Sequence, residues 1–128
     1  MTEKELDMLR NAGIDAEKAV QRLMGKEHIF LRSLQRFADD ENCDHFLSSL
    51  EKKDYQEAFR AVHTLKGTAA NVGVESVADI ADILTEELRN GCPADPEKTE
   101  KIKKNAAQLR CAFLTAQAAI RKFMPQPQ

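Results

Sequence analysis

The sequence has few of the residues that mark membrane, secreted or nucleic-acid-binding proteins. It contains no tryptophan, one tyrosine and no proline before Pro93. No apolar run approaches the roughly 18 residues that a membrane-spanning helix needs, so we expect no membrane segment. The N-terminus lacks the charged-then-apolar order of a signal peptide, and we therefore expect a cytoplasmic protein. The net charge of −2 provides no basic footprint for nucleic acid.

Cysteine and phosphate-binding motifs are also scarce. The three cysteines, Cys43, Cys92 and Cys111, are odd in number and show no C-x-x-C spacing, which argues against a disulfide framework and a zinc site. We expect reduced, partly buried thiols without a function. The sequence contains no glycine-rich phosphate loop, no kinase motif and no paired acidic site of the kind that holds Mg²⁺. We therefore expect no ATP use and no cofactor on this chain.

Glycine and proline divide the chain into helical segments. Four of the five glycines fall between periodic segments, and only Gly67 lies inside one. No alternating pattern predicts a strand. The predicted helices are short ones at 2–11 and from Asp15 to Gly25, a long one from Lys26 to about Lys52 that loosens near 39–42, one opened by a capping box of Asp54 with Glu57, one at about 75–90, and a last one capped by Asp95 and Pro96.

These segments predict an all-α fold. The connections between the four long helices span only a few residues, which favours antiparallel neighbours. We therefore predict an up-down-up-down four-helix bundle with short N-terminal helices packed against it. The chain length suits a single domain with one core. We place that domain at residues 1–124 and predict a disordered tail at 125–128.

The segment from Asp54 to Gly73 carries two helical stripes, one apolar and one that contains His63, Lys66, Gly67 and Ala70. Side chains on a helix lean toward its N-terminus, so the residue one turn later normally covers the surface beside His63. That residue is Gly67, which has no side chain, although an interior glycine costs a helix about 0.5–1 kcal/mol relative to alanine. The glycine therefore indicates close approach by another molecule, and Lys66 supplies a cation for an anion held on the imidazole.

This motif also resembles a known family. The spacing His-x-Leu-Lys-Gly-x5-Gly, from His63 to Gly73, resembles the histidine-containing phosphotransfer (HPt) family, which carries phosphoryl groups between receiver domains of two-component relays. The likeness covers about residues 12–91, and one departure is Leu84-Thr85, where many members have Leu-Glu. Upstream it includes 12–15, 22–25 and Phe37. The resemblance independently implies the same helical bundle.

The resemblance implies a division of labour between this chain and its partners. His63 would be the phosphoacceptor and Lys66 would stabilise charge, because phosphoryl transfer needs mainly positioning and charge stabilisation. Mg²⁺ and the donor or acceptor aspartate would belong to a response-regulator receiver domain, and a hybrid sensor histidine kinase is a further candidate partner. We expect this chain to be a monomer. The candidates for the docking rim are Gly67, Ala70, Glu86 and Arg89, and Gly73 has a structural role.

Two other classes of function compete with the relay. A di-metal carboxylate site in a helical bundle uses Glu-x-x-His pairs. The positions three before the three histidines hold glycine, asparagine and arginine, so that pattern is absent. A non-catalytic helical adaptor, in which His63 binds receiver-like partners without being phosphorylated, stays open on the sequence alone. We interpret His28 and His45 as structural or surface residues.

Overall fold

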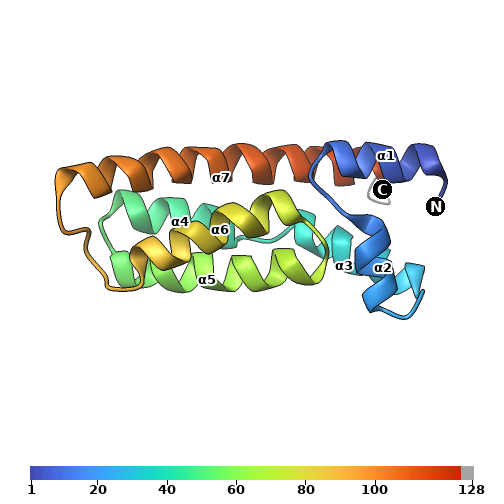
Figure 1. Cartoon of the computed structure of the whole chain (residues 1–128), viewed down its shortest axis with the longest axis horizontal. Helices are drawn as coiled ribbons and strands as arrows, with labels where there is room; N and C mark the ends of the chain where they lie inside the picture. The colour runs from blue at the N-terminus through green and yellow to red at the C-terminus, as the bar shows by residue number, and fades with distance from the viewer. Residues whose placement is uncertain (125–128) are drawn as a thin grey trace.

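Helix α7 (Pro96–Phe123) runs along most of the long axis of the molecule (Figure 1). The computed structural model describes residues 1–124. Within that range the chain is all helical, as predicted, with one isolated antiparallel bridge. The predicted tail at 125–128 lies outside the described residues. The other helices are α1 (Glu3–Asn11), α2 (Ala16–Arg22), α3 (Glu27–Ala38), α4 (Asn42–Glu51), α5 (Tyr55–Asn71) and α6 (Glu75–Leu88).

Helix α5 packs against both α4 and α6, and α7 covers α3, α4 and α6. The apolar stripe predicted on α5 faces this core, because its members are all buried. The apolar stripe of α7 is likewise buried, apart from the half-buried Phe123 at its end. Burying such stripes is what holds short antiparallel helices together, since isolated helices of this length are marginal in water. The buried residues of these stripes are Ala58, Val62, Leu65, Ala69 and Val72, and Ile102, Ala106, Leu109, Phe113, Ala116 and Ile120.

The predicted long helix from Lys26 to about Lys52 is divided into α3 and α4. The break falls within 39–42, where the helix was predicted to loosen, but the predicted continuity through that segment is wrong. The carboxylate of Asp40 accepts a hydrogen bond from the backbone N–H of Asn42 at 2.8 Å. An aspartate that binds the amide two residues on offers the backbone an alternative to the helix. The side chain of Gln117 on α7 then donates to the free carbonyl of Ala38 at 2.7 Å. Local side-chain chemistry breaks the helix, and a tertiary contact satisfies the carbonyl of its last residue.

Three predicted aspartate caps open their helices, but one capping box is wrong. Asp15, Asp54 and Asp95 each accept a hydrogen bond from the backbone N–H three residues later. In the predicted box, however, the N–H of Asp54 donates to the carbonyl of Ser49 at 2.9 Å. The carboxylate of Glu57 instead contacts His45 and Arg60. A box needs the reciprocal bond from the cap N–H, and here that donor is already used by the α4–α5 turn.

The α1–α2 connection docks onto the turn between α5 and α6. Ile14 and Val74 form the isolated bridge, and the N–H of Asp15 donates to the carbonyl of Gly73 at 2.8 Å. Gly73 has φ +75°, and a Cβ added there would lie 2.6 Å from the carbonyl oxygen of Asp15. Only glycine fits both the backbone conformation and the close contact. This turn therefore fixes how α5 and α6 lie against each other.

Candidate functional site

His63 lies exposed in the middle of α5, and a neighbouring aromatic ring orients it. Its imidazole stacks on Phe59, one turn earlier, with ring centroids 5.8 Å apart and an interplanar angle of 10°. Phe59 is half-buried, so it restricts the ring without covering it. No hydrogen bond to the imidazole occurs within the described residues, which leaves its nitrogens available to a partner. Phe59 was not among the residues predicted from the sequence, although its spacing of four residues from His63 places it on the same face.

The surface one turn after His63 is open. Gly67 is exposed and has ordinary helical geometry, and a Cβ added there would meet no heavy atom within 4 Å outside its own helix backbone and immediate neighbours. Contacts with the rest of the fold therefore do not explain this glycine. Its effect on the surface is to leave the approach to His63 uncovered.

Lys66 reaches the neighbouring helix. Its Nζ lies 2.8 Å from Oδ1 of Asp82 on α6, and both side chains are partly exposed. The cation predicted beside His63 is therefore already paired in this structure. Asp82 was not among the residues predicted from the sequence. Asp82 and Lys66 lie at similar distances from the turn at Gly73, one on each of two consecutive helices.

Glu86 and Arg89 form a pair on α6 beside the stacked rings. The guanidinium donates two hydrogen bonds to the carboxylate, at 2.7 and 3.2 Å, and its Cζ lies 5.7 Å from the Phe59 ring centroid. The hydrogen bonds from Arg89 lower the pKa of Glu86, and the nearby Lys66 cation lowers it further. Conversely, the hydrogen bond to Glu86 raises the pKa of Arg89. Both groups are exposed, so this mutual stabilisation is screened by solvent.

The remaining predicted residues lie at the C-terminal end of α5. Ala70 is half-buried, and its carbonyl accepts a hydrogen bond from Nη1 of Arg22, on α2, at 2.8 Å. Gly73 is buried in the turn. The structure thus brings His63, Lys66, Glu86 and Arg89 around one exposed face with Gly67, places Ala70 at its edge, and keeps Gly73 beneath the surface.

The departure at Leu84-Thr85 lies inside the molecule. Thr85 is fully buried, and its hydroxyl donates to the carbonyl of Ala81 at 2.7 Å. A serine or threonine that bonds back to its own helix satisfies its hydroxyl without a partner. Thr85 is therefore withdrawn from the exposed face, whereas Glu86, one position later, lies on it.

The other histidines and the cysteines lie apart from this face. The Nε2 of His45, on α4, lies 3.2 Å from the Glu57 carboxylate, and His28 is exposed near the start of α3. All three cysteines are free thiols. Burial raises the pKa of the Cys43 thiol to about 12. The prediction of partly buried thiols is wrong for the exposed Cys92 and Cys111.

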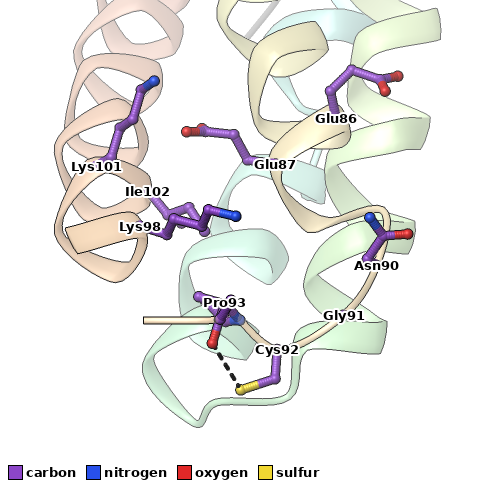
Figure 2. Close-up of a pocket in the computed structure, with 10 residues that line it drawn as sticks. Glu86, Glu87, Asn90, Gly91, Cys92, Pro93, Lys98, Lys101 and Ile102 are labelled. Carbon is purple, nitrogen blue, oxygen red and sulfur yellow. Dashed lines mark hydrogen bonds between the residues drawn. The ribbon is translucent and has the colours of Figure 1, made fainter. Parts of the chain in front are cut away.

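A cavity of about 360 Å³ lies at the connection between α6 and α7 (Figure 2). Lys98 and Lys101 line it on one side, and Glu87 points from α6 toward α7 while Glu86 points away. The amide of Asn105 on α7 donates to Glu87 at 2.8 Å. The lining includes Glu86 but neither His63 nor Lys66, so the histidine face is an exposed helix surface outside this cavity.

Across residues 1–124, no group of three or more histidine, cysteine or acidic side chains is arranged to hold a metal ion. None of the helices in that range is long and apolar enough to cross a bilayer.

The described chain is all helical, and one exposed histidine on a helix face stacks on a neighbouring aromatic ring. Comparison with protein families identifies the family: a model described as the Hpt domain matches residues 29–112. This match covers well over half of the chain, and the chain therefore belongs to the Hpt domain family. No curated protein and no solved structure matched the chain.

The family match confirms the resemblance inferred from the motif and shifts its limits. It begins after the short N-terminal helices and extends into α7, whereas the sequence likeness was placed at about 12–91. Hpt domains are phosphotransfer intermediates of two-component signalling and interact with receiver domains; they are not kinases. The matched range includes all of α4, α5 and α6, and therefore the whole histidine face.

Proposed function

We propose that this chain relays a phosphoryl group between aspartates of receiver domains through phosphorylated His63. The observation that carries the proposal is the combination around this one imidazole: it is exposed, its ring is oriented by Phe59, the next turn is bare at Gly67, and a cation lies at Lys66. His45 lacks this setting because it contacts a glutamate on the adjoining helix.

The proposed step needs little from this chain beyond a positioned nucleophile. An unprotonated ring nitrogen of His63 attacks the phosphorus of an aspartyl phosphate. A P–N bond forms as the P–O bond to the aspartate breaks, and the electron pair leaves on the carboxylate oxygen. The proton on the other ring nitrogen stays there or passes to water. Attack by the aspartate of a second receiver domain reverses these changes and regenerates the free imidazole.

The surroundings of His63 support this step electrostatically and sterically. Lys66 is placed to balance charge on the transferred group, which is the main task of a protein in phosphoryl transfer. Gly67, Ala70, Glu86 and Arg89 form the proposed docking rim, with Gly67 supplying clearance. We place the required Mg²⁺ on the receiver domain, and a hybrid sensor kinase is a further candidate partner. Monomeric state and cytoplasmic location stay predictions from the sequence.

We also propose that α4, α5, α6 and α7 make up the up-down-up-down bundle that presents this face. Short connections at 52–54 and 72–74 join the first three of these helices, and consecutive helices pack against each other. Helices joined by so few residues and packed side by side run in opposite directions. This order places the Lys66 and Asp82 side chains at the same level of the bundle, in accord with their ion pair.

The test is phosphotransfer from a radiolabelled, phosphorylated receiver domain. We expect His63→Gln to abolish labelling of this chain, and the label on the wild type to be acid-labile and alkali-stable, as for a phosphoramidate. His45→Gln is the matched control, because it removes an exposed imidazole from the neighbouring helix; it should label normally. Label retained in His63→Gln would refute the assignment. Binding of cognate receivers without any transfer would instead favour the adaptor.

A further inference from the structure

Two cations near His63, Lys66 and Arg89, are held by carboxylates of α6. Lys66 pairs with Asp82 at 2.8 Å, and Arg89 pairs with Glu86 at 2.7 Å. A phosphoryl group arriving on His63 therefore meets cations that already have anionic partners. Any gain from pairing with the phosphoryl group is reduced by the loss of the existing ion pair.

The two ion pairs differ in how readily they exchange partners. Glu86 and Arg89 belong to one helix, and their two hydrogen bonds form a fork that holds the planar guanidinium. Lys66 and Asp82 are joined by a single contact between two helices. A lysine ammonium has three donors on a flexible stem. Because Lys66 lies three residues after His63, it can turn from Asp82 to a phosphoryl group on the imidazole.

We propose that Asp82 is a positioning residue for the relay, which holds the Lys66 ammonium beside the free imidazole and competes for it once His63 is phosphorylated. The inference rests on the proposed function of His63. No additional covalent step is involved, since Lys66 only exchanges one ion pair for another. By this competition Asp82 weakens the hold of the chain on its phosphoryl group and favours its release to the next receiver domain.

The first experiment measures the equilibrium distribution of label between a receiver domain and this chain. Asp82→Asn keeps the side-chain shape and removes the competing charge. Partly exposed ion pairs change equilibria by about two- to fivefold, and we expect the distribution to move toward phosphorylated His63 by that factor. An unchanged distribution would overturn the proposal.

Two further variants separate the role of Lys66 from a general charge effect. Asp79→Asn removes the same charge from the exposed surface of α6 one turn earlier, and Asp79 has no ion pair within residues 1–124; we expect a clearly smaller shift. In a Lys66→Ala background, Asp82→Asn should shift the distribution of label much less, because the Lys66 ammonium for which Asp82 and the phosphoryl group compete is absent. An equal effect with and without Lys66 would show that Asp82 acts by its charge alone and would contradict the proposed competition.

A second experiment needs no receiver domain. The small-molecule phosphoryl donor phosphoramidate is offered to the chain in place of a receiver domain, and we expect it to phosphorylate His63. ³¹P NMR then follows the second ionisation of the phosphoryl group with pH. The charged groups around it are Lys66 and Arg60 on α5, and Asp82, Glu86 and Arg89 on α6. Freeing Lys66 by Asp82→Asn favours the dianion, so its apparent pKa should fall by about 0.3–0.7, the equivalent of a two- to fivefold change.

The two experiments distinguish failure of the inference from failure of the proposed function. Absence of transfer from receivers, together with the expected ³¹P shift in Asp82→Asn, would contradict the relay and retain the competition for Lys66. Normal transfer from receiver domains with an unchanged ³¹P titration in Asp82→Asn would support the relay and contradict the competition for Lys66. A His63 that accepts a phosphoryl group from neither donor would overturn both.

Discussion

At the scale of single residues, the histidine face is distinguished by a missing side chain. Gly67 lies in regular helix with open space above it, so the fold itself accepts a side chain there. Glycine in a helix interior costs stability because the unfolded chain has more freedom to lose. Under the proposed function, Gly67 gives up some stability in exchange for clearance beside His63. Stability and transfer should therefore respond in opposite directions to substitution.

We expect Gly67→Ala to raise the free energy of unfolding by about 0.5–1 kcal/mol in urea denaturation. Gly67→Leu should also remain folded, but its side chain leans toward His63 and obstructs the incoming aspartyl phosphate. Displacement by about 1 Å can slow a reaction on the order of 10²-fold, so transfer from a receiver should fall by a factor of that order.

The control for Gly67→Leu is Ala107→Leu, which adds a similar side chain at an exposed position on α7. We expect that variant to accept label at the wild-type rate. If Gly67→Leu unfolds, internal packing is the reason for the glycine. If it transfers like the wild type, the clearance argument fails.

At the scale of elements, the turn between α5 and α6 sets the level at which Lys66 meets Asp82. Two glycines with similar left-handed backbones, Gly73 with φ +75° and Gly91 with φ +85°, differ in their surroundings. A Cβ on Gly73 would approach the carbonyl of Asp15 and the methyl of Ala19, whereas one on Gly91 would meet nothing within 4 Å. Substitutions at Gly73 and Gly91 therefore distinguish the cost of backbone strain, which both share, from the cost of disturbing the docked N-terminal helices, which only Gly73 carries.

We expect Gly91→Ala to lower the free energy of unfolding by about 1–2 kcal/mol, the ordinary cost of a left-handed residue with a side chain. Gly73→Ala should lose clearly more, because the contact between Gly73 and Asp15 must also open. Urea denaturation of both variants measures the difference. Equal losses would mean that the docked α1–α2 connection contributes little to stability.

At the scale of the whole molecule, the features that depend on residues close together in the sequence could be predicted, and those that depend on tertiary contacts could not. Aspartate caps and apolar stripes recur at helical spacing, so the all-helical fold and the His63 face are predictable. The break between α3 and α4 depends on a turn at Asp40 that a contact from Gln117 completes, and that contact is tertiary. Asp82 was missed for a different reason, because a surface carboxylate becomes notable only once its partner on α5 is known.

Burial of the Cys43 thiol makes the free energy of unfolding of the whole fold depend on pH. Cys43 is 1% exposed, and burial raises the pKa of its thiol from 9.0 to about 12. The folded chain therefore keeps this thiol protonated at pH values where the unfolded chain ionises it. The stability associated with this group is complete below about pH 9 and is lost as the pH rises toward 12.

Comparison with Cys43→Ala isolates this contribution, since other groups that titrate in alkali are common to both proteins. Between pH 8 and pH 10 in reducing buffer, the wild type should lose about 1.4 kcal/mol more of its free energy of unfolding than the variant, because one proton over one pH unit above pH 9 is worth that amount. Urea denaturation at the two pH values provides the measurement. If the wild type and Cys43→Ala lose the same free energy of unfolding between the two pH values, the Cys43 thiol ionises in the folded protein. In that case α4 opens to solvent without unfolding the core.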